Sequence, residues 1–423
     1  MTGGTHDADV CVVGLGYVGL PLAVAFAEAG VAIVGFDVDH DKVARIESGA
    51  SPVEDIADER LAACLAGSLG VTSLIADAKM ATTYIICVPT PLKESMPDLG
   101  FVESAARLVG EVLSPGDLVI LESTTYPGTT EEFVAPLLTE VSGLSAGSDF
   151  DLAYSPERID PGNVTWTVAT TPKVVGGVTE RATDRAAALY GRVARDVVRA
   201  SGTAEAEMAK LLENTFRHVN IALVNELSVY CRALDIDIWE VIRLASTKPF
   251  GFMPFHPGPG VGGHCIPVDP SYLSWALRRH GFQFRFVELA QEINARMPAY
   301  VVNRAAELLN LSGLALSRAR IVCVGLAYKP GVADCRESPA LEVTKQLLAK
   351  GADVAYHDPF VGQVTLSGRT LHSVDLAPAL ATADLVVVLT AHPSVDWSAL
   401  AEAGVPVLDT RNAVPAGTNV HGL

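Results

Sequence analysis

The stretch VCVVGLGYVG, residues 10–19, decides the fold of this chain. An apolar run over 8–14 passes directly into the spaced glycines Gly14, Gly16 and Gly19, and helical periodicity continues over 17–29. A second apolar run covers 31–37. This order predicts a strand–helix–strand unit, in which the glycine turn brings the N–H groups of the helix N-terminus close to a phosphate.

A carboxylate closes the second strand of that unit. Asp37 lies 18 residues beyond Gly19, where a dinucleotide-binding unit accepts hydrogen bonds from ribose hydroxyls. Because a carboxylate there would repel a 2′-phosphate, the pattern predicts NAD rather than NADP. A glycine-rich turn without a ligand is the weaker alternative.

Apolar runs continue the alternation of strands and helices. In the first part of the chain they fall at 83–88, 118–122, 151–154 and 173–176, which predicts a doubly wound parallel sheet. Apolar residues then recur at helical spacing over 204–234, which predicts a helix long enough to cross a whole domain, and such a helix commonly serves as a spine or as a dimer contact.

The last third of the chain returns to alternation. Strands are expected at 320–325, 353–357, 384–390 and 405–409, and a helix at 338–349. The loop GLAYKP at 325–330 lacks the second and third glycines of a dinucleotide turn, so it predicts a different ligand. The fold class is therefore α/β, with two doubly wound Rossmann-like domains, related in architecture, joined by a long central helix.

Composition excludes several classes of protein. A net charge of −18 over 423 residues argues against nucleic acid and anionic membranes as partners. The seven cysteines include no CxxC pair, so neither a disulfide framework nor a metal site is predicted. Cys11, Cys87 and Cys323 fall in apolar runs and are expected to be packing residues. We find no apolar run of membrane-spanning length and no leader pattern, and we expect a cytoplasmic protein.

The segment GGHCIPVDP, residues 262–270, places a thiol after a run rich in glycine and proline. Such a loop suits close approach of a ligand better than packing in a core, so Cys265 is interpreted as a nucleophile. A thiol beside a nicotinamide captures an aldehyde and then permits loss of a second hydride, which predicts four-electron oxidation of an alcohol to an acid. Asp269 either tunes protonation or holds Lys210, and a helix cap is its structural alternative. We expect a structural or substrate-contact role for His264.

Polar residues elsewhere suit the same chemistry. Lys210 and Asn214 lie four apart on the expected long helix, where an ammonium steadied by an amide stabilises a developing alkoxide. A solvated helix face is the alternative. The segments 122–130 and 155–158 follow strands, so their hydroxyls and carboxylate are expected at the ligand-binding edge of the sheet, in position to orient a hydrolytic water. Helix capping is the alternative for Thr129 and Thr130.

Together these segments resemble the nucleotide-sugar dehydrogenase family, which includes the UDP-glucose, UDP-N-acetylhexosamine and GDP-mannose dehydrogenases. The resemblance rests on GLGYVG at 14–19, VPTP at 88–91, ESTTYPGTT at 122–130, SPER at 155–158, the helix of Lys210 and Asn214 with Asn225-Glu226, GGHCIPVDP at 262–270, GLAYKP at 325–330 and RESPA at 336–340. It implies an NAD-binding domain over 1–203, a central helical dimerisation domain over 204–305 and a UDP-sugar-binding domain over 306–423.

The resemblance also implies a role for each matching residue. Cys265 is the nucleophile and Lys210 stabilises the oxyanion with help from Asn214 and Asp269, while Thr124 and Glu157 handle water and protons. The cofactor residues are Gly14, Gly16, Tyr17, Val18, Gly19, Asp37, Lys42, Pro89, Thr90, Thr124 and Arg336. The substrate residues are Glu157, Arg158, Lys210, Asn214, Arg217, His218, Phe255, Gly262, Gly263 and Lys329. Arg217 and His218 are candidates to contact the 2-substituent of the sugar.

Within the family, the run TKPFGFMPFHPGPG at 247–260 looks most like UDP-N-acetylglucosamine 6-dehydrogenase. The resemblance therefore implies a homodimeric or larger enzyme of polysaccharide biosynthesis that oxidises C6 of a UDP-N-acetylhexosamine with two NAD and no metal. Two departures are His256, where that branch has a tyrosine, and the segment 333–335. UDP-glucose and UDP-N-acetylmannosamine are alternative substrates. A two-electron hydroxyacid dehydrogenase and an inactive NAD-binding regulator are the alternatives of another kind.

Overall fold

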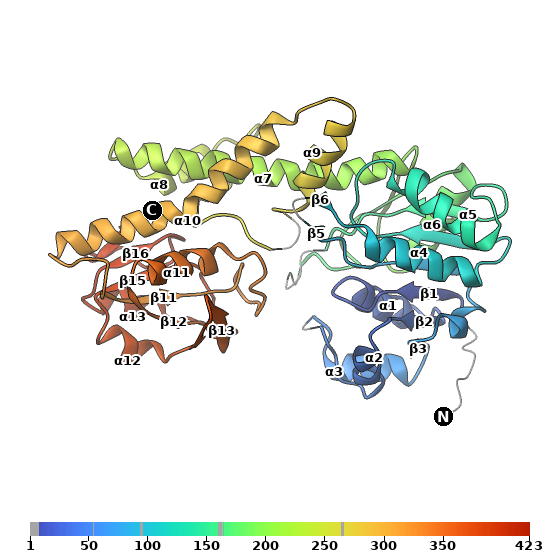
Figure 1. The fold of residues 1–423 in the computed structure, drawn as a ribbon, viewed down its shortest axis with the longest axis horizontal. Helices are drawn as coiled ribbons and strands as arrows, with labels where there is room; N and C mark the ends of the chain where they lie inside the picture. Colours follow the sequence, from blue (N-terminus) through green and yellow to red (C-terminus); the bar gives the residue numbers. More distant parts are fainter. Residues whose placement is uncertain (1–7, 54, 94–95, 160–162, 164, 264–265) are drawn as a thin grey trace. The chain divides into compact units, whose positions relative to one another are not determined.

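The structure is a computed structural model that describes residues 8–53, 55–93, 96–159, 163, 165–263 and 266–423. Its packing divides the chain into two compact units. Unit 1 comprises Met1–Glu213 with Ser271–Gly281, and unit 2 comprises Asn214–Pro270 with Phe282–Leu423. The elements are labelled along the chain in Figure 1.

Unit 1 is built on an eight-stranded sheet in which strand order runs outward in both directions from β1. Across the sheet the strands are β10 (Val197–Arg199), β9 (Lys173–Gly177), β8 (Asp151–Tyr154), β7 (Leu118–Leu121), β4 (Thr83–Ile86), β1 (Val10–Val13), β2 (Ile33–Phe36) and β3 (Leu69–Thr72). This order confirms the doubly wound fold expected from the glycine turn and the alternating runs.

One strand pair differs from the expectation of a wholly parallel sheet. β9 pairs with β8 antiparallel, with Ala153 opposite Gly177 and Tyr154 opposite Gly176. A parallel neighbour requires a crossover, usually a helix. The described residues between these two strands form no helix, and the chain returns along the adjacent strand. The start of β9 therefore lies beyond the carboxyl end of β8.

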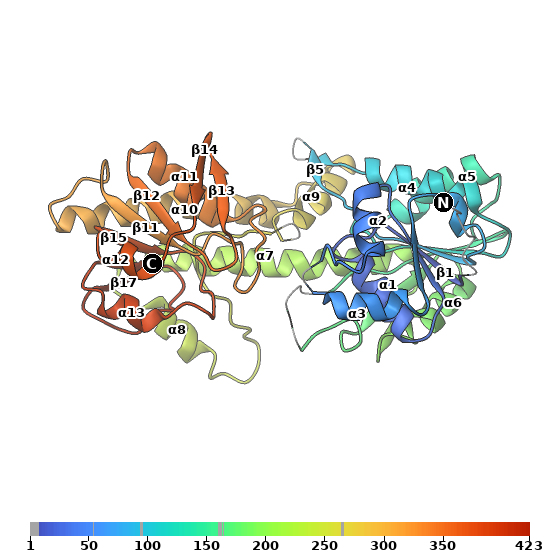
Figure 2. The ribbon, with the colours of Figure 1, turned by 90° about the horizontal axis from the view of Figure 1, so that it is seen from below.

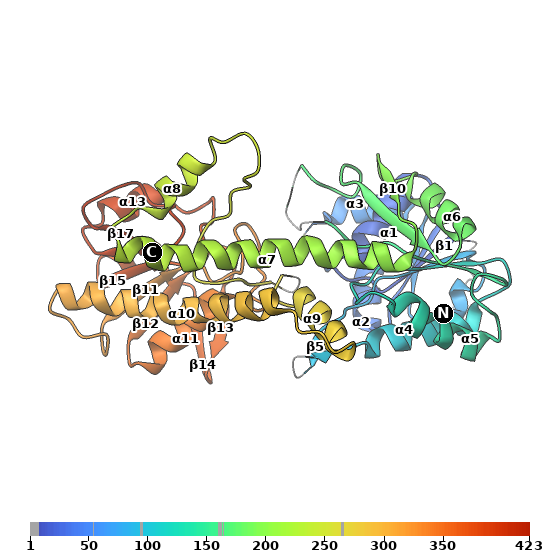
Figure 3. The same cartoon turned by 90° about the horizontal axis from the view of Figure 1, so that it is seen from above.

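Helices cover both faces of this sheet, which explains why its strands are apolar on both sides. α1 (Gly19–Glu28), α3 (Asp58–Leu65) and α6 (Glu180–Tyr190) lie on one face, whereas α4 (Gly100–Val112) and α5 (Ala135–Ser142) lie on the other (Figure 3). The remaining elements are α2 (His40–Glu47), the short helical turns η1 (Ile75–Ala78) and η2 (Thr130–Val134), and the antiparallel pair of β5 (Leu92–Lys93) and β6 (Met96–Pro97).

Two helices have residues in both units. α7 (Thr203–Ala233) is 31 residues long, which confirms the long helix expected over 204–234. α9 (Asp269–Arg279) packs its central turns on unit 1, where Tyr272 Oη donates to the Thr90 carbonyl at 2.8 Å and the Trp275 ring lies 4.9 Å from that of Tyr126.

Unit 2 contains the second α/β sheet, and this confirms the expected α/β architecture of the last third of the chain. Its parallel strands, in order, are β12 (Asp353–His357), β11 (Arg320–Val324), β15 (Leu385–Val388), β16 (Val407–Asp409) and β17 (Val420–Gly422). α10 (Arg285–Leu311) and α11 (Pro339–Ala349) cover one face, and α12 (Leu376–Leu380) and α13 (Trp397–Glu402) cover the other (Figure 2). The unit also holds α8 (Ile238–Ala245) and the hairpin β13 (Gln363–Leu366) with β14 (Arg369–His372).

The burial of the cysteines agrees with their sequence setting. Cys11, Cys87 and Cys323 are buried, as expected for packing residues. Among the residues that the structure describes, we find no helix with both the length and the apolar character needed to cross a membrane.

The turn after β11 repeats the corner after β1 without its later glycines. Gly325 has φ +84°, and the N–H groups of Leu326 and Ala327 donate to Asp358 Oδ2 at 2.7 and 3.1 Å. His392 contacts the same carboxylate oxygen through Nε2 at 3.1 Å. The buried aspartate therefore fixes the loop that carries Lys329.

Gly325→Ala is expected to destabilise unit 2, because a Cβ would stand 2.3 Å from the Thr390 carbonyl oxygen. Gly331→Ala is a matched control, since Gly331 has a similar φ of +78° and no atom within 4 Å of an added Cβ. Both variants carry the cost of positive φ, but only the first adds overpacking, worth about 1–3 kcal/mol more in the free energy of unfolding. Urea denaturation followed by circular dichroism measures the difference. Equal unfolding midpoints for the two variants would show that an added Cβ at Gly325 does not overpack against Thr390.

Candidate active site

The glycine corner of unit 1 has the geometry that a dinucleotide phosphate requires. Gly14 has φ +96°, and a Cβ there would stand 2.9 Å from the Cys87 carbonyl oxygen. A Cβ on Gly19 would overlap the Gly14 carbonyl, so this glycine allows α1 to start against the loop. By contrast, an added Cβ on Gly16 meets nothing within 4 Å. The backbone at Gly16 is thus open to a ligand at the helix N-terminus, and the corner fits a dinucleotide pyrophosphate.

Asp37 lies at the end of β2 beside this corner. Its Oδ2 accepts from the Leu15 N–H at 2.8 Å and from Lys42 Nζ at 2.7 Å, while Oδ1 accepts from the Asp39 N–H at 3.0 Å. The structure therefore brings together Asp37, Lys42 and the glycine loop, three features that the sequence assigned to cofactor binding.

The other residues assigned to the cofactor fall in both units. Tyr17 is exposed in the loop before α1, and Val18, the N-cap residue of α1, packs partly against the core. Thr90, next to Pro89, is held by Tyr272, and Thr124 is half-buried after β7. Arg336 belongs to unit 2, where its guanidinium donates to Asp334 at 2.6 Å.

A cluster of buried charges lies at the carboxyl ends of β7 and β8. Lys173, at the start of β9, donates to the fully buried Glu122 carboxylate, and its Nζ stands 3.6 Å from Glu157 Oε2. Tyr190 Oη donates to the other oxygen of Glu122. Glu157 Oε1 accepts from the Ile159 N–H, whereas its buried Oε2 has no hydrogen-bond partner. The Lys173 ammonium thus neutralises parts of two carboxylates, and Glu157 Oε2 can accept a hydrogen bond from a further donor.

The two carboxylates titrate differently. Burial raises the pKa of Glu122 to about 7, against the opposing effect of Lys173. Burial also acts to raise the pKa of Glu157, but Lys173, its hydrogen bonds and Lys210 outweigh burial, and that pKa is lowered. At neutral pH Glu157 is therefore an anion beside a cation. This is the state that a general base needs.

α7 supplies two more buried charges to unit 1. Lys210 is buried and lies near enough for its charge to lower the pKa of Glu157. One turn earlier, Glu207 accepts from the Gly128 N–H at 2.6 Å and from the Thr130 N–H and hydroxyl at 2.9 and 2.7 Å. Glu207 therefore caps the start of the helix after the 122–130 segment. The capping carboxylate therefore comes from α7, whereas Thr129, at the N-cap position, makes no capping hydrogen bond with its own side chain.

In unit 2, the Asn214 amide donates to the Asp269 carboxylate at the start of α9. Both side chains were assigned to catalysis, and the structure brings them together. Gly262 and Gly263 pack so closely that an added Cβ would stand 2.7 Å from Pro339 and 2.8 Å from the Tyr328 ring, respectively. Cys265, the assigned nucleophile, and His264 lie outside the described residues.

The remaining residues assigned to the substrate have individual surroundings. In unit 2, Phe255 packs edge-on against Phe216 at 5.6 Å, Arg217 is exposed, His218 is buried, and Lys329 Nζ lies 5.9 Å above the Tyr328 ring. In unit 1, Arg158 pairs with Glu213 at 2.7 Å and donates to the Pro172 carbonyl at 2.7 Å.

Comparison with known proteins decides the family. Three profiles match consecutive parts of the chain: the NAD binding domain of the UDP-glucose/GDP-mannose dehydrogenase family at 8–194, its central domain at 204–296 and its UDP binding domain at 322–416. The chain belongs to the UDP-glucose/GDP-mannose dehydrogenase family. It is accordingly an NAD-dependent nucleotide-sugar dehydrogenase, and NAD is its cofactor.

Individual members of this family are similar over most of their length. A UDP-N-acetyl-D-mannosamine dehydrogenase from Pyrococcus horikoshii is 39% identical over 98% of each chain. A UDP-N-acetyl-D-glucosamine 6-dehydrogenase from Pseudomonas aeruginosa is 38% identical over 84% of this chain and 83% of that protein. Among solved structures, the UDP-D-ManNAc dehydrogenase from P. horikoshii has a TM-score of 0.89 at 38% identity, covering 98% of each chain.

Three charged residues of this dehydrogenase were not singled out from its sequence. Glu122 and Lys173 fall within the expected runs 118–122 and 173–176, and Glu207 falls within the run 204–234, but none of them was individually assigned a role from the sequence. Lys173 starts an apolar strand, and Glu207 lies between apolar positions of α7, so each interrupts a buried pattern. A charge at a position expected to be buried is the signal that would have identified them.

The acidity of Glu207 predicts a pH-dependent stability. Burial raises its pKa to about 7 from an ordinary value of 4.5. Between these values the folded state holds a proton that the unfolded state has released, so the contribution of Glu207 to the unfolding free energy is full below pH 4.5 and is lost as pH rises to about 7. Glu207→Gln should reduce the slope of unfolding free energy against pH in this window by up to about 1.4 kcal/mol per pH unit.

Urea denaturation at a series of pH values measures that slope. Glu205→Gln on the same helix is the matched control and should leave the slope unchanged. Identical slopes for Glu207→Gln and the wild type would show that Glu207 does not titrate in this window.

Proposed function

We propose that this enzyme oxidises C6 of a UDP-N-acetylhexosamine to the carboxylate with two NAD in succession, with UDP-N-acetylglucosamine as the first candidate. The observation that carries the proposal is the largely buried anion Glu157, whose pKa is lowered by the charges of Lys173 and Lys210 in unit 1. Such a group is required where alcohol and water protons are removed in a site closed to solvent.

The proposed chemistry assigns one task to each residue. Lys210 stabilises the developing alkoxide, and Glu157 accepts the proton of the attacking water, with Thr124 orienting that water. Asn214, held by Asp269, adds an amide donor. The Cys265 thiolate adds to the C6 aldehyde to give a thiohemiacetal, and loss of a hydride yields a thioester. Water then hydrolyses the thioester to the acid and restores the thiol. NAD held at the glycine corner and Asp37 would supply the acceptor for both hydrides, one from C6 of the alcohol as the aldehyde forms and one from the thiohemiacetal.

UDP-N-acetylmannosamine is the second candidate substrate. Similar proteins of P. horikoshii and Escherichia coli carry the name of that activity, whereas the P. aeruginosa relative carries the name of the glucosamine epimer. Two-electron hydroxyacid oxidation has no use for Cys265 or a UDP domain. An assay with UDP-glucose and the UDP forms of N-acetylglucosamine, N-acetylgalactosamine and N-acetylmannosamine selects among these functions by the NADH formed per sugar, which should be two.

Cys265→Ser should abolish turnover, with a fall in kcat of at least about 10³-fold, because serine is a far weaker nucleophile than a thiolate at neutral pH. Cys231→Ser, which changes a half-buried cysteine of α7, is the matched control and should retain activity. Mass spectrometry of the stalled wild-type enzyme should find the sugar attached at Cys265. Undiminished turnover by Cys265→Ser would refute the thioester mechanism and favour a two-electron reaction.

We propose that unit 2 also forms the dimer contact. Its part of α7 exposes a row of large apolar side chains at helical spacing, namely Phe216, Leu223, Leu227 and Tyr230, and the exposed Leu234 follows directly after the helix. A row of this kind is typical of a surface that a second copy of the chain covers in a two-fold contact.

Leu223→Glu should therefore shift the protein from dimer to monomer, because a buried interface does not accommodate an unpaired carboxylate. Leu311→Glu at the end of α10 changes an equally apolar exposed residue outside the row and should leave the mass unchanged. Light scattering after size-exclusion chromatography measures both. A dimer that persists in Leu223→Glu would place the contact elsewhere.

A further inference from the structure

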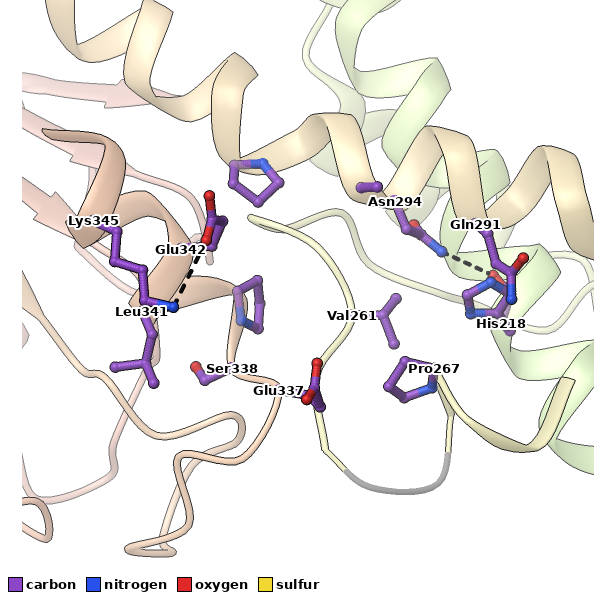
Figure 4. Close-up of a pocket in the computed structure, with 13 residues that line it drawn as sticks. His218, Val261, Pro267, Gln291, Asn294, Glu337, Ser338, Leu341, Glu342 and Lys345 are labelled. Carbon is purple, nitrogen blue, oxygen red and sulfur yellow. Dashed lines mark hydrogen bonds and ion pairs between the residues drawn. The ribbon is translucent and has the colours of Figure 1, made fainter. Parts of the chain in front are cut away.

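A cavity of about 400 Å³ lies within unit 2, between α7, α10 and the start of α11 (Figure 4). Val261 and Pro267 form part of one wall, and His218, Gln291 and Asn294 form another. This volume is in the range of small-molecule sites in proteins. Of the residues assigned to the substrate, the cavity includes only His218.

The cavity contains a buried histidine, His218, whose ring nitrogens are unpaired. Its side chain is 2% exposed, yet neither Nδ1 nor Nε2 has a hydrogen-bond partner. Burying both nitrogens unpaired costs stability, and buried polar groups nearly always find partners. An imidazole left open beside a cavity is therefore explained if a ligand supplies the missing hydrogen bonds.

The neighbouring amide of Asn294 is already engaged. Asn294 Oδ1 accepts from Asn225 at 2.9 Å, and Nδ2 donates to the His218 carbonyl oxygen at 3.4 Å. Asn294 thus fixes the backbone of His218 and leaves its ring to the cavity. Gln291, one turn earlier on α10, places a second amide next to the ring (Figure 4).

The charges of the cavity argue for a neutral ligand. Burial lowers the pKa of His218 to about 4, so its imidazole is uncharged at neutral pH and offers one donor and one acceptor. On α11 Lys345 stands 4.0 Å from Glu342, and the exposed Glu337 adds a second carboxylate. Two carboxylates against one ammonium disfavour an anion.

We propose that this cavity binds a neutral carboxamide, with the His218 ring and the Gln291 amide hydrogen-bonding to it and Val261 and Pro267 contacting its apolar substituent. A carboxamide has at least one N–H donor and a carbonyl acceptor at separate positions, which matches two adjacent polar side chains better than a single hydroxyl does. The carboxamide comes either from the acetamido group of the sugar, which rests on the proposed function, or from a separate small molecule.

Titration calorimetry on the full chain tests this assignment with two matched pairs of probes. UDP-N-acetylglucosamine and UDP-glucose differ at the acetamido group, and nicotinamide and nicotinate differ in carboxamide against carboxylate. The variant is His218→Leu, and the control is His372→Leu, which changes an exposed histidine of β14.

Two results support the proposal and identify the source of the carboxamide. If the acetamido group occupies the cavity, His218→Leu raises the Kd of UDP-N-acetylglucosamine at least tenfold and leaves that of UDP-glucose unchanged. If a separate amide does so, the variant loses nicotinamide binding, keeps both UDP-sugars, and nicotinate binds neither protein at this site. Affinities of His218→Leu that equal the wild type for all four probes overturn the proposal.

Two further measurements distinguish a wrong assignment of the cavity from misfolding of the variant and from failure of the proposed function. Because His218→Leu removes two unpaired buried nitrogens, its thermal midpoint should equal or exceed that of the wild type, and Gln291→Leu provides the same binding comparison if His218→Leu does not fold. Binding requires no turnover. Absence of NADH formation with every UDP-sugar would therefore refute the proposed function, whereas only the binding comparison decides the role of the cavity.

Discussion

A buried carboxylate at the end of the second strand holds the first turn of each α/β sheet. In unit 1 Asp37 accepts from the Leu15 N–H, and in unit 2 Asp358 accepts from the N–H groups of Leu326 and Ala327. In both sheets these amides follow a glycine with positive φ at the end of the first strand. This one hydrogen-bonding arrangement sets the direction in which the chain leaves each sheet, so the placement of α1 and of the Lys329 loop depends on it.

The two corners differ in what remains open. In unit 1, Lys42 reaches Asp37 from α2, and the backbone at Gly16 faces free space. In unit 2 the buried ring of His392 occupies the corresponding side of Asp358, and its Nδ1 accepts from the Gly331 N–H at 3.2 Å. The corner in unit 1 thus leaves backbone open for a phosphate. In unit 2, the equivalent hydrogen bonds to Asp358 hold the loop that carries Lys329 in place.

Local pattern was sufficient for most of the fold and for the cofactor corner. The glycine spacing, the strand ends and the carboxylate at position 37 all lie within one strand–helix–strand unit, so their geometry follows from short-range rules. The direction of β9 did not follow from pattern, because an apolar run has the same composition in either direction. Lys173 and Glu207 were missed for a related reason, since their partners lie 51 and 77 to 79 residues away in the sequence. The pairing of Asn214 with Asp269, in contrast, joins two motifs that the sequence had already identified.

The reversed direction of β9 has an electrostatic consequence. A strand that ran parallel to β8 would begin at the opposite edge of the sheet, and its first residue would be far from Glu122 and Glu157. Because the strand is reversed, Lys173 joins the carboxylates from a backbone that is itself hydrogen-bonded, its N–H donating to the Asp196 carbonyl at 2.9 Å. The Lys173 ammonium is therefore held by a hydrogen-bonded strand, so its electrostatic field is fixed before a proton is transferred. A counter-ion on a loop would have to reorient during each proton transfer. Lys173 is preorganised, because the direction of one strand places its ammonium beside the carboxylates.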